Sequence, residues 1–549
     1  MNNKNNRIII DKSNTNIDNF HKNKFRINLD RVTFIFIVIS FLFILFSTRV
    51  IYLSTKTLPN NIYKANQVNR ADIVDRNGDY ISKSVFTTNV GVDPTLVKDK
   101  KKLLLKLQYT FPNKNFDMIK KKIYGKKFFY IEKKITPERY YEIKLLGEKS
   151  IRLEKKITRI YPDKNLFSHV VGQIDDENNG ISGIEKSFDK QLKKSKDNLT
   201  LTLDKNLQFI IRNELINAQK IFGNVGGAGI LMNINNGEIL SLVSLPDFNL
   251  NSRKDISDPN YINRATKGVY ELGSVFKSFT IAAGLNDGLI SPKDMFLNLE
   301  KKMKCGGRTI SEYDENLPND LSVEDILTYS SNIGSVKIGQ IIGQEKLKNF
   351  LEKIGILGQL NFDIHEIGKP IPFKWRNCKL KTVSYGHGIT TTPIQLAKGY
   401  AILSNGGYEI KPTLIKKEFY DKKKRVLDKD ISLEMNAMFR KVVEHGTASL
   451  SDVEGYEVGG KTGTAQIVEN GLYTKKKINT FASVFPTSNP KYVLIVLLED
   501  TKLSKDYIYN YRNKPGSYKG TPFNTAGWTS VEIAGKIIDK IGPILATKY

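Results

Sequence analysis

This sequence contains little cysteine and little histidine. Its 549 residues include two cysteines, Cys305 and Cys378, and five histidines. Two cysteines are too few for the multi-bridge framework of a small disulfide-stabilised domain, and the sequence leaves open whether these two pair. The histidines show no spacing typical of metal ligands. We therefore expect no metal site and no cofactor.

Acidic residues are scarce relative to basic ones. The chain contains 85 Lys and Arg against 57 Asp and Glu, which gives a formal net charge of +28. Such an excess is typical of nucleic-acid-binding proteins, but no zinc-finger spacing, RNA-binding aromatic signature or helix-turn-helix pattern accompanies it. We therefore expect no nucleic-acid partner. The lysines are spread along the chain, so we expect most of them on solvated faces and a smaller share against anionic lipid headgroups or cell-wall polymer.

One long hydrophobic run lies near the N-terminus. Residues 1–31 are polar, Asn-rich and net basic, which predicts a short disordered tail. Residues 32–53 are almost wholly apolar apart from Arg49, and about 20 such residues suffice to span a bilayer. A cleaved signal peptide is the alternative, but its leading region would be long and no Ala-x-Ala-like site follows. One span with the basic tail in the cytoplasm places all later residues outside it.

A candidate nucleophile lies in the second half of the chain. Ser274 is followed three residues later by Lys277, in an apolar stretch that predicts a buried helix ending at 286–288. Residues three apart on a helix share a face, so the Lys277 amine would lie near the Ser274 hydroxyl and activate it. The pattern alone is weak, because Ser-x-x-Lys occurs again at 187–190 and 488–491.

Two further patterns follow Ser274 in a fixed order. They are Ser330-Ser331-Asn332 and Lys461-Thr462-Gly463-Thr464, and neither Ser-x-Asn nor Lys-Thr-Gly recurs in the chain. Serine-lysine, serine-x-asparagine and lysine-threonine-glycine in this order are the three motifs of penicillin-recognising serine acyl transferases. The second half of the chain therefore resembles that group of enzymes.

The region before the nucleophile carries patterns of its own. Short alternating apolar runs such as 127–132 and 151–153 predict strands. Spaced glycines and Asn-Gly pairs also indicate tight turns. Three patterns resemble the pedestal, or dimerisation, module of class B penicillin-binding proteins: Arg70-Ala71-Asp72-Ile73-Val74-Asp75-Arg76-Asn77-Gly78, Arg159-Ile160-Tyr161-Pro162, and His169-Val170-Val171-Gly172 leading to Gly180-Ile181-Ser182-Gly183-Ile184-Glu185.

The resemblance implies an α+β architecture with four parts. They are a cytoplasmic tail at 1–31, a single transmembrane helix at 32–53, an extended and mostly β pedestal at 54–200, and a penicillin-binding transpeptidase domain at 201–549. The last is expected to be a mixed α/β domain in which helices flank an antiparallel sheet.

The resemblance also implies site residues. The catalytic set would be Ser274, Lys277, Ser330, Asn332 and Lys461, and the substrate-binding set Thr462, Gly463 and Thr464. Ser274 would attack the substrate carbonyl, a neutral Lys277 would accept its proton, and Ser330 would bridge Lys277 and Lys461. Asn332 would hold the substrate amide, while Lys461 and the threonine hydroxyls would bind its terminal carboxylate. His387 and His445 are interpreted as structural.

The implied function is that of a peptidoglycan D,D-transpeptidase, a β-lactam target that cross-links stem peptides through a Ser274 acyl-enzyme. The C-terminal tail at 525–538 and the Tyr385-Gly386-His387-Gly388 patch resemble the division-specific, FtsI-type branch. The alternatives are an elongation-specific enzyme and a membrane β-lactam sensor. No glycosyltransferase pattern is found, and the resemblance implies an FtsW-type membrane polymerase and other division proteins as partners. The implied location is the bacterial inner membrane, with the catalytic domain in the periplasm.

One competing motif overlaps the lysine pattern. Residues 455–462, Gly-Tyr-Glu-Val-Gly-Gly-Lys-Thr, match the phosphate-binding P-loop letter for letter. A P-loop requires a strand before it and a helix after it. The following residues, 463–468, predict a strand instead, so we favour the acyl-transferase interpretation.

Overall fold

The computed structural model describes residues 10–11, 27–55, 70–252, 258, 261–418, 424–469 and 471–548. These belong to two units, 1–68 and 69–549, each of which is described by itself. Most of the predicted disordered tail lies outside the described residues. Within it, β1 (Ile10–Asp11) pairs in parallel with β2 (Ile27–Asn28).

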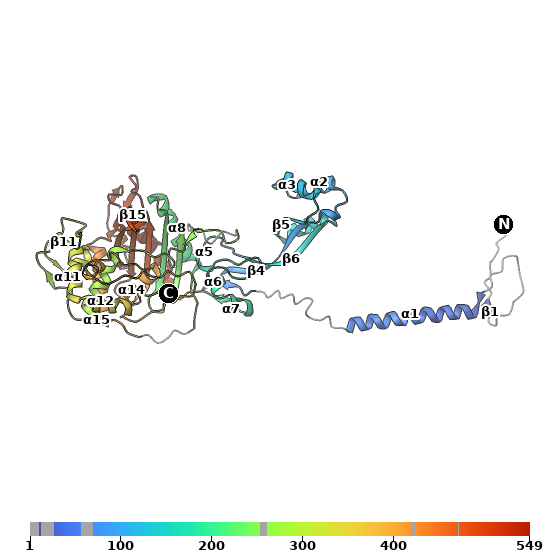
Figure 1. The fold of residues 1–549 in the computed structure, drawn as a ribbon, viewed down its shortest axis with the longest axis horizontal. Helices are drawn as coiled ribbons and strands as arrows, with labels where there is room; N and C mark the ends of the chain where they lie inside the picture. The colour runs from blue at the N-terminus through green and yellow to red at the C-terminus, as the bar shows by residue number, and fades with distance from the viewer. Residues whose placement is uncertain are drawn as a thin grey trace. The chain divides into compact units, whose positions relative to one another are not determined.

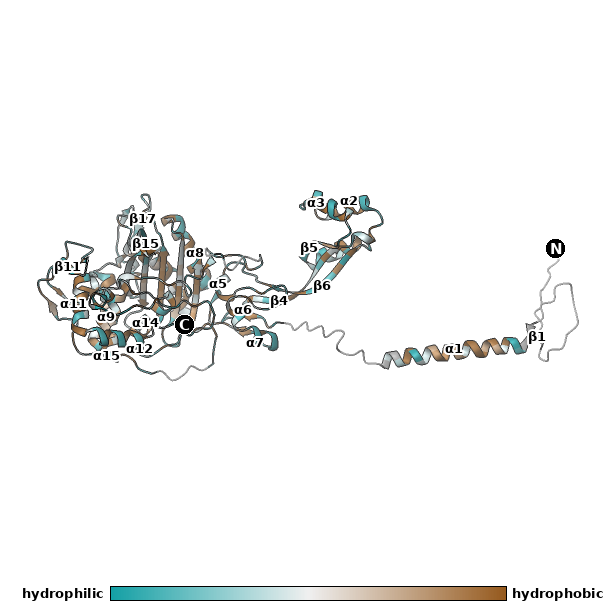
Figure 2. Ribbon diagram, in the orientation of Figure 1, coloured by the Kyte–Doolittle hydropathy of each residue, from teal (hydrophilic) through white to brown (hydrophobic). Residues whose placement is uncertain are grey.

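The first unit contains one long helix, α1 (Leu29–Thr55). Its stretch Asp30–Tyr52 is long and apolar enough to cross a membrane, and no part of it is buried among the residues that the structure describes. Figure 2 shows hydrophobic residues along most of the helix. The unburied apolar surface is what a bilayer would cover.

The pedestal region of the second unit is built on a small sheet. Its strands are β3 (Ile73–Val74), β4 (Tyr80–Val92), β5 (Phe129–Ile135), β6 (Ile151–Ile160) and β7 (Leu199–Thr200). The order is β5-β4-β3-β7, with β6 also paired to β4. The strands expected near 127–132 and 151–153 are therefore present as β5 and β6.

Helices also contribute to this region. They are α2 (Lys100–Thr110), α3 (Phe116–Tyr124) and α4 (Pro137–Leu145), and each begins at a side-chain cap, Asp99, Asn115 and Thr136 respectively. Together with β4 and β5 they enclose a small hydrophobic core that is separate from the main core. This small core includes Val90, Leu103, Leu107 and Ile123. The sequence patterns did not reveal these helices.

The three pedestal patterns meet in one buried ion cluster. Glu185 accepts hydrogen bonds from Arg70 Nε at 2.5 Å and from Arg159 Nε at 2.8 Å, and all three side chains are at most 1% exposed. Asp189 accepts from Arg70 Nη1 at 2.7 Å, and the Tyr161 hydroxyl lies 3.4 Å from Glu185. The residues of these turn-like patterns therefore also stabilise the pedestal, through buried ion pairs.

The transpeptidase region contains a five-stranded antiparallel sheet in the order β14-β15-β16-β8-β9. Its strands are β8 (Gly226–Asn233), β9 (Ile239–Leu245), β14 (Gly459–Glu469), β15 (Leu472–Phe485) and β16 (Tyr492–Glu499). β9 is buried at every position, and β8 and β16 at all but one. Both faces of the sheet must therefore be covered.

Helices provide that cover. α8 (Lys205–Phe222) and α16 (Ser530–Lys548) pack against each other and on the sheet, and α14 (Pro393–Ser404) and α15 (Lys429–Glu444) also pack on it. Figure 1 shows helices on both sides of the strands. The predicted class, a mixed α/β domain with helices flanking an antiparallel sheet, is confirmed.

Shorter elements make up the remaining secondary structure that is described in this unit. The helices are α5 (Ser168–Val171), α6 (Gly183–Ser187), α7 (Asp189–Lys194), α9 (Lys277–Asn286), α10 (Val323–Thr328), α11 (Asn332–Ile342), α12 (Gln344–Lys353) and α13 (Asn377–Ser384). The strands are β10 (Met295–Phe296), β11 (Lys302–Cys305), β12 (Arg308–Ser311), β13 (Leu321–Ser322), β17 (Ile508–Asn510) and β18 (Ser517–Lys519). The 3₁₀ turns are η1 (Pro94–Leu96), η3 (Gly273–Phe276), η4 (Ser449–Ser451) and η5 (Ala526–Trp528).

The two cysteines pair. A disulfide joins Cys305, at the end of β11, to Cys378 in α13, with 5.5 Å between their Cα atoms. It ties the β11–β12 hairpin to a helix 73 residues away in sequence. The question that the sequence left open is answered by this pairing.

Removing the carboxylate of Glu185 is expected to destabilise the pedestal strongly. Glu185→Ala leaves two buried guanidinium groups short of a counter-charge, a loss of about 3–5 kcal/mol in unfolding free energy. Glu142→Ala in α4 is the control, since its ion pair with Arg139 is exposed and contributes about 1 kcal/mol or less. Urea unfolding of the detergent-solubilised protein measures both. Equal losses in the two variants would contradict a structural role for the cluster.

Candidate active site

The candidate nucleophile lies on a tight turn that leads into a buried helix. Ser274 is half-buried within η3, and Lys277 is the first residue of α9 and fully buried. Gly273 has a φ of +63°, and a Cβ there would lie 2.8 Å from the carbonyl oxygen of Thr464. The turn thus needs glycine in front of the serine, both for its backbone conformation and for its close approach to β14.

Lys277 contacts both ends of the predicted serine-x-asparagine motif. Its Nζ donates to Ser330 Oγ at 3.0 Å and to Asn332 Oδ1 at 2.8 Å, and also to the backbone carbonyl of Ser330. Ser330 has a φ of +65°, an uncommon conformation for a residue with a side chain. Such strain is typical of functional sites, where the surrounding structure enforces it.

Asn332 is held from two sides. It begins α11, where Ser331 provides the N-cap by accepting from Gly334 N at 2.9 Å. Its Nδ2 donates to the carbonyl of Ser311 at 2.8 Å, which leaves Oδ1 directed at Lys277. One amide proton of Asn332 therefore remains for another acceptor.

Lys461 and Gly463 lie on β14, the edge strand of the large sheet. Lys461 is fully buried, and its Nζ donates to the carbonyl of Thr462 at 3.3 Å and to Thr462 Oγ1 at 3.4 Å. A Cβ at Gly463 would lie 2.1 Å from the carbonyl oxygen of Leu272. Only glycine allows the edge strand to approach the nucleophile turn this closely. Because this motif forms a strand, the P-loop interpretation is wrong.

The two predicted substrate-binding hydroxyls already have partners within the protein. Thr462 Oγ1 lies 2.6 Å from Thr447 Oγ1. Thr464 Oγ1 donates to Asn479 Oδ1 at 3.0 Å and accepts from Ala526 N at 2.9 Å. A ligand carboxylate would therefore have to compete with, or add to, these hydrogen bonds.

The predicted bridge through Ser330 is found on one side only. Ser330 Oγ accepts from Lys277. Across the described parts of the chain, no hydrogen bond joins Ser330 to Lys461, whose Nζ instead bonds to Thr462. The bridge between the two lysines stays a prediction.

Burial shifts the charge state of both lysines. Desolvation lowers the pKa of Lys277 to about 7, although the negative charge of Glu312 acts in the opposite direction. Burial, followed by the positive charge of Lys277, lowers the pKa of Lys461 well below its usual value. Because the Lys277 ammonium disfavours a charge on Lys461, the pair carries less than two full charges at neutral pH. The neutral, proton-accepting form of Lys277 increases as the pH rises through 7.

The two histidines interpreted as structural have different surroundings. The His387 ring stacks on Tyr385 and Tyr473, and its Nε2 lies 3.2 Å from the Tyr473 hydroxyl. His445 is exposed and lies 4.0 Å from Glu444. Neither arrangement places a histidine on Lys277 or Lys461.

Three residues near the site were missed by the sequence analysis. Glu271 accepts hydrogen bonds from the Tyr473 hydroxyl at 3.1 Å and from Gly388 N at 3.0 Å. Thr447 meets Thr462, and Glu312 bonds to the segment around Asn332. The sequence assigns these residues no role, because the partners they contact lie in other segments and spacing alone gives no signal for such contacts.

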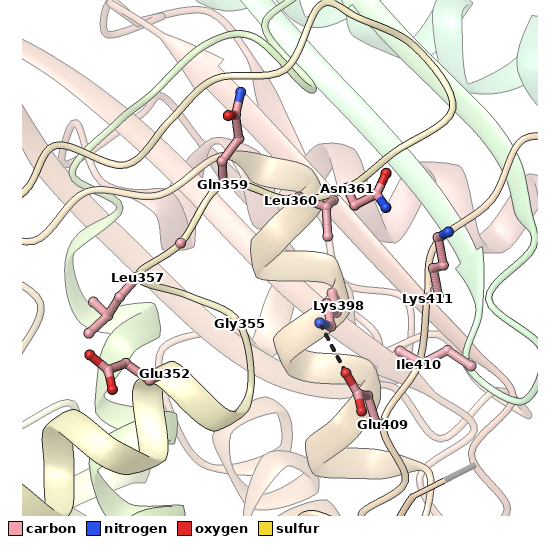
Figure 3. Close-up of a pocket in the computed structure, with 11 residues that line it drawn as sticks. Glu352, Gly355, Leu357, Gln359, Leu360, Asn361, Lys398, Glu409, Ile410 and Lys411 are labelled. Atoms are coloured by element: carbon pink, nitrogen blue, oxygen red, sulfur yellow. Dashed lines mark ion pairs between the residues drawn. The ribbon is translucent and has the colours of Figure 1, made fainter. Parts of the chain in front are cut away.

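A separate pocket of about 520 Å³ lies elsewhere in the transpeptidase region (Figure 3). Its lining includes Glu352 at the end of α12, Lys398 on α14, and Glu409, which pairs with Lys398 at 3.9 Å. None of the predicted site residues lines it. It therefore does not compete with Ser274 as the candidate active site.

Comparison with protein families gives two matches that together cover most of the chain. Residues 227–519 match the penicillin-binding protein transpeptidase domain, and residues 65–224 match the penicillin-binding protein dimerisation domain. The chain belongs to the penicillin-binding protein family. The pedestal and transpeptidase modules of this penicillin-binding protein thus follow one another in the predicted order.

Individual relatives carry names from peptidoglycan synthesis. The probable peptidoglycan D,D-transpeptidase FtsI of Caulobacter vibrioides is 30% identical over 497 residues, which cover 87% of this penicillin-binding protein and 82% of the relative. The peptidoglycan D,D-transpeptidase FtsI of Escherichia coli is 26% identical, with 80% of each chain covered. The crystal structure of a peptidoglycan synthetase from Bifidobacterium adolescentis shares the fold, with a TM-score of 0.65, 20% identity, and 87% and 95% of the two chains covered.

Proposed function

We propose that this penicillin-binding protein is a serine-type peptidoglycan D,D-transpeptidase of the FtsI type. The observation that carries the proposal is the contact of one buried lysine, Lys277, with both members of the serine-x-asparagine motif. The nucleophile turn and the edge strand β14 meet beside it, at Gly273 and Gly463. The names of the bacterial relatives support the same activity.

The first step is acylation. Ser274 Oγ attacks the carbonyl of the peptide bond between two terminal D-alanines, and neutral Lys277 accepts the Ser274 proton. Backbone N–H groups of Ser274 and Thr464 stabilise the oxyanion. Ser330 passes a proton to the leaving amine, D-alanine departs, and an ester on Ser274 remains.

Substrate positioning is assigned to Asn332 and to β14. The free amide proton of Asn332 binds the substrate amide, and Gly463 leaves the strand edge open for an extended stem peptide. Lys461 and the hydroxyls of Thr462 and Thr464 bind the terminal carboxylate. An arriving carboxylate favours the charged form of Lys461, which burial by itself disfavours.

The second step forms the cross-link. An amine from a neighbouring stem peptide attacks the acyl-enzyme, releases Ser274, and joins the two strands. A β-lactam mimics the first step and leaves a stable acyl-enzyme, which makes it an inhibitor and a label for the site.

The domain arrangement follows from this assignment. We assign residues 1–31 to the cytoplasm, 32–53 to the membrane, 54–200 to the pedestal and 201–549 to a periplasmic transpeptidase domain. The FtsI names of the relatives favour septal synthesis over elongation. The location of fluorescent penicillin label bound to this protein in growing cells, at the septum or along the side wall, distinguishes the two roles.

Ser274 is expected to be the residue that penicillin acylates. Peptide mapping of the labelled full-length protein should place the adduct on Ser274, and Ser274→Ala should take up no label. Ser488→Ala is the matched control, because Ser488 and Lys491 repeat the Ser-x-x-Lys pattern at an exposed position. Labelling of Ser274→Ala at the wild-type rate would refute the proposed function.

The protein is also expected to make no glycan on its own. The space before the transpeptidase domain matches a dimerisation domain, so donor strands must come from a partner, for which we propose an FtsW-type polymerase. Purified protein given lipid-linked disaccharide precursor should yield no polymer, and co-purification with the polymerase should depend on residues 32–200. Polymer formed by the purified protein alone would exclude this division of labour.

A further inference from the structure

Glu312 is a buried carboxylate that the mechanism above does not use. It follows β12 directly and is 8% exposed. Its Oε1 accepts from Ser331 Oγ at 2.6 Å and from Ile333 N at 2.9 Å, and its Oε2 accepts from Asn332 N at 2.7 Å. All three donors lie in the segment 331–333. This segment includes or directly adjoins Ser330 and Asn332, the two residues that contact Lys277.

These hydrogen bonds provide acceptors for backbone N–H groups at the start of α11. The first N–H groups of a helix have no partner within the helix. Glu312 accepts those of Asn332 and Ile333, while Ser331 accepts that of Gly334. A carboxylate at this end also interacts favourably with the helix dipole. The position of α11, and with it Asn332, therefore depends on a residue outside the helix.

The same short segment also orients the Asn332 side chain. The carbonyl of Ser311, next to Glu312, accepts from Asn332 Nδ2 and so directs Oδ1 at Lys277. One dipeptide thus fixes both the backbone and the amide group of Asn332.

The dipeptide is itself anchored from outside. β11 and β12 pair antiparallel along their whole length, and the disulfide from Cys305 to Cys378 ties this hairpin to α13. Glu312 N also donates to the carbonyl of Lys301 at 3.1 Å. Glu312 is therefore presented to α11 by a fixed hairpin.

We propose that Glu312 is a positioning residue for acylation: through its hydrogen bonds to Ser331, Asn332 and Ile333 it holds the Ser330–Asn332 segment against Lys277. The inference rests on the proposed function. Among the described residues, Glu312 from the β11–β12 hairpin is the charged group that acts on the pKa of Lys277, and it opposes the effect of burial. Lys461 from β14 faces the same amine, and the Lys277 ammonium disfavours a charge on it.

The test compares rates of Ser274 acylation by fluorescent penicillin across pH in full-length wild-type protein, Glu312→Gln and Glu312→Asp. Glu312→Gln should lower the maximal rate by about tenfold or more, because small misplacements of reacting groups are costly. It should also shift the midpoint of the pH profile to lower pH, because the charge that favours protonated Lys277 is gone. Glu312→Asp should lose rate but keep a midpoint close to that of the wild type.

Asp325→Asn is the matched control. Asp325 also caps a helix N-terminus, that of the neighbouring α10, where its carboxylate accepts from Ser322 N at 3.1 Å. This variant should lose stability without a shift of the pH midpoint. A folded Glu312→Gln with wild-type rate and midpoint would overturn the inference, and if that variant does not fold, a wild-type rate in Glu312→Asp would do so. A wild type that takes no label at Ser274 would instead refute the proposed function itself.

Discussion

The burial of two lysine side chains in one site is the constraint on which the rest of the catalytic region depends. Removing an ammonium group from water is costly, and a second one nearby increases the cost. Lys277 meets this cost with three oxygen acceptors from Ser330 and Asn332, and with the charge of Glu312. The result is an amine that exchanges its proton near neutral pH, as a general base requires.

The large sheet supplies the rigidity for this arrangement. β14 is at its edge, so one side of the strand is free to face the nucleophile turn and an extended substrate. Helices cover both faces of the neighbouring strands, which fixes the edge in place. Gly463 then determines how close the strand and the turn can come. Lys461, two residues earlier, is buried by the same packing.

Much of the site could be predicted from the sequence because acyl transfer restricts residue type and order. The three motifs identify the segments that meet around Lys277. Other contacts could not be predicted, since they join residues far apart in the chain: Glu312 with α11, Thr464 with Asn479 and Ala526, and Cys305 with Cys378.

In the pedestal, too, some features could be predicted from the sequence and others could not. Its strands follow from alternating apolar runs, whereas α2–α4 lie in Lys-rich sequence. On α2, lysines precede and interrupt the leucines, and of these leucines only Leu103 and Leu107 are buried. The motif residues Arg70, Arg159 and Glu185 were recognised as a pattern, but their buried charge cluster depends on folding. Turn chemistry alone does not predict it.

The most direct test of the account is the pH dependence of Ser274 acylation in the wild-type protein. Single-turnover reaction with a fluorescent penicillin should accelerate about tenfold per pH unit below the midpoint and level off above it. The midpoint should lie near pH 7, where burial places the pKa of Lys277. A rate that is flat between pH 5.5 and 9, or that still rises steeply at pH 9 as expected for an unperturbed lysine near 10.4, would contradict the central role of the buried lysine pair.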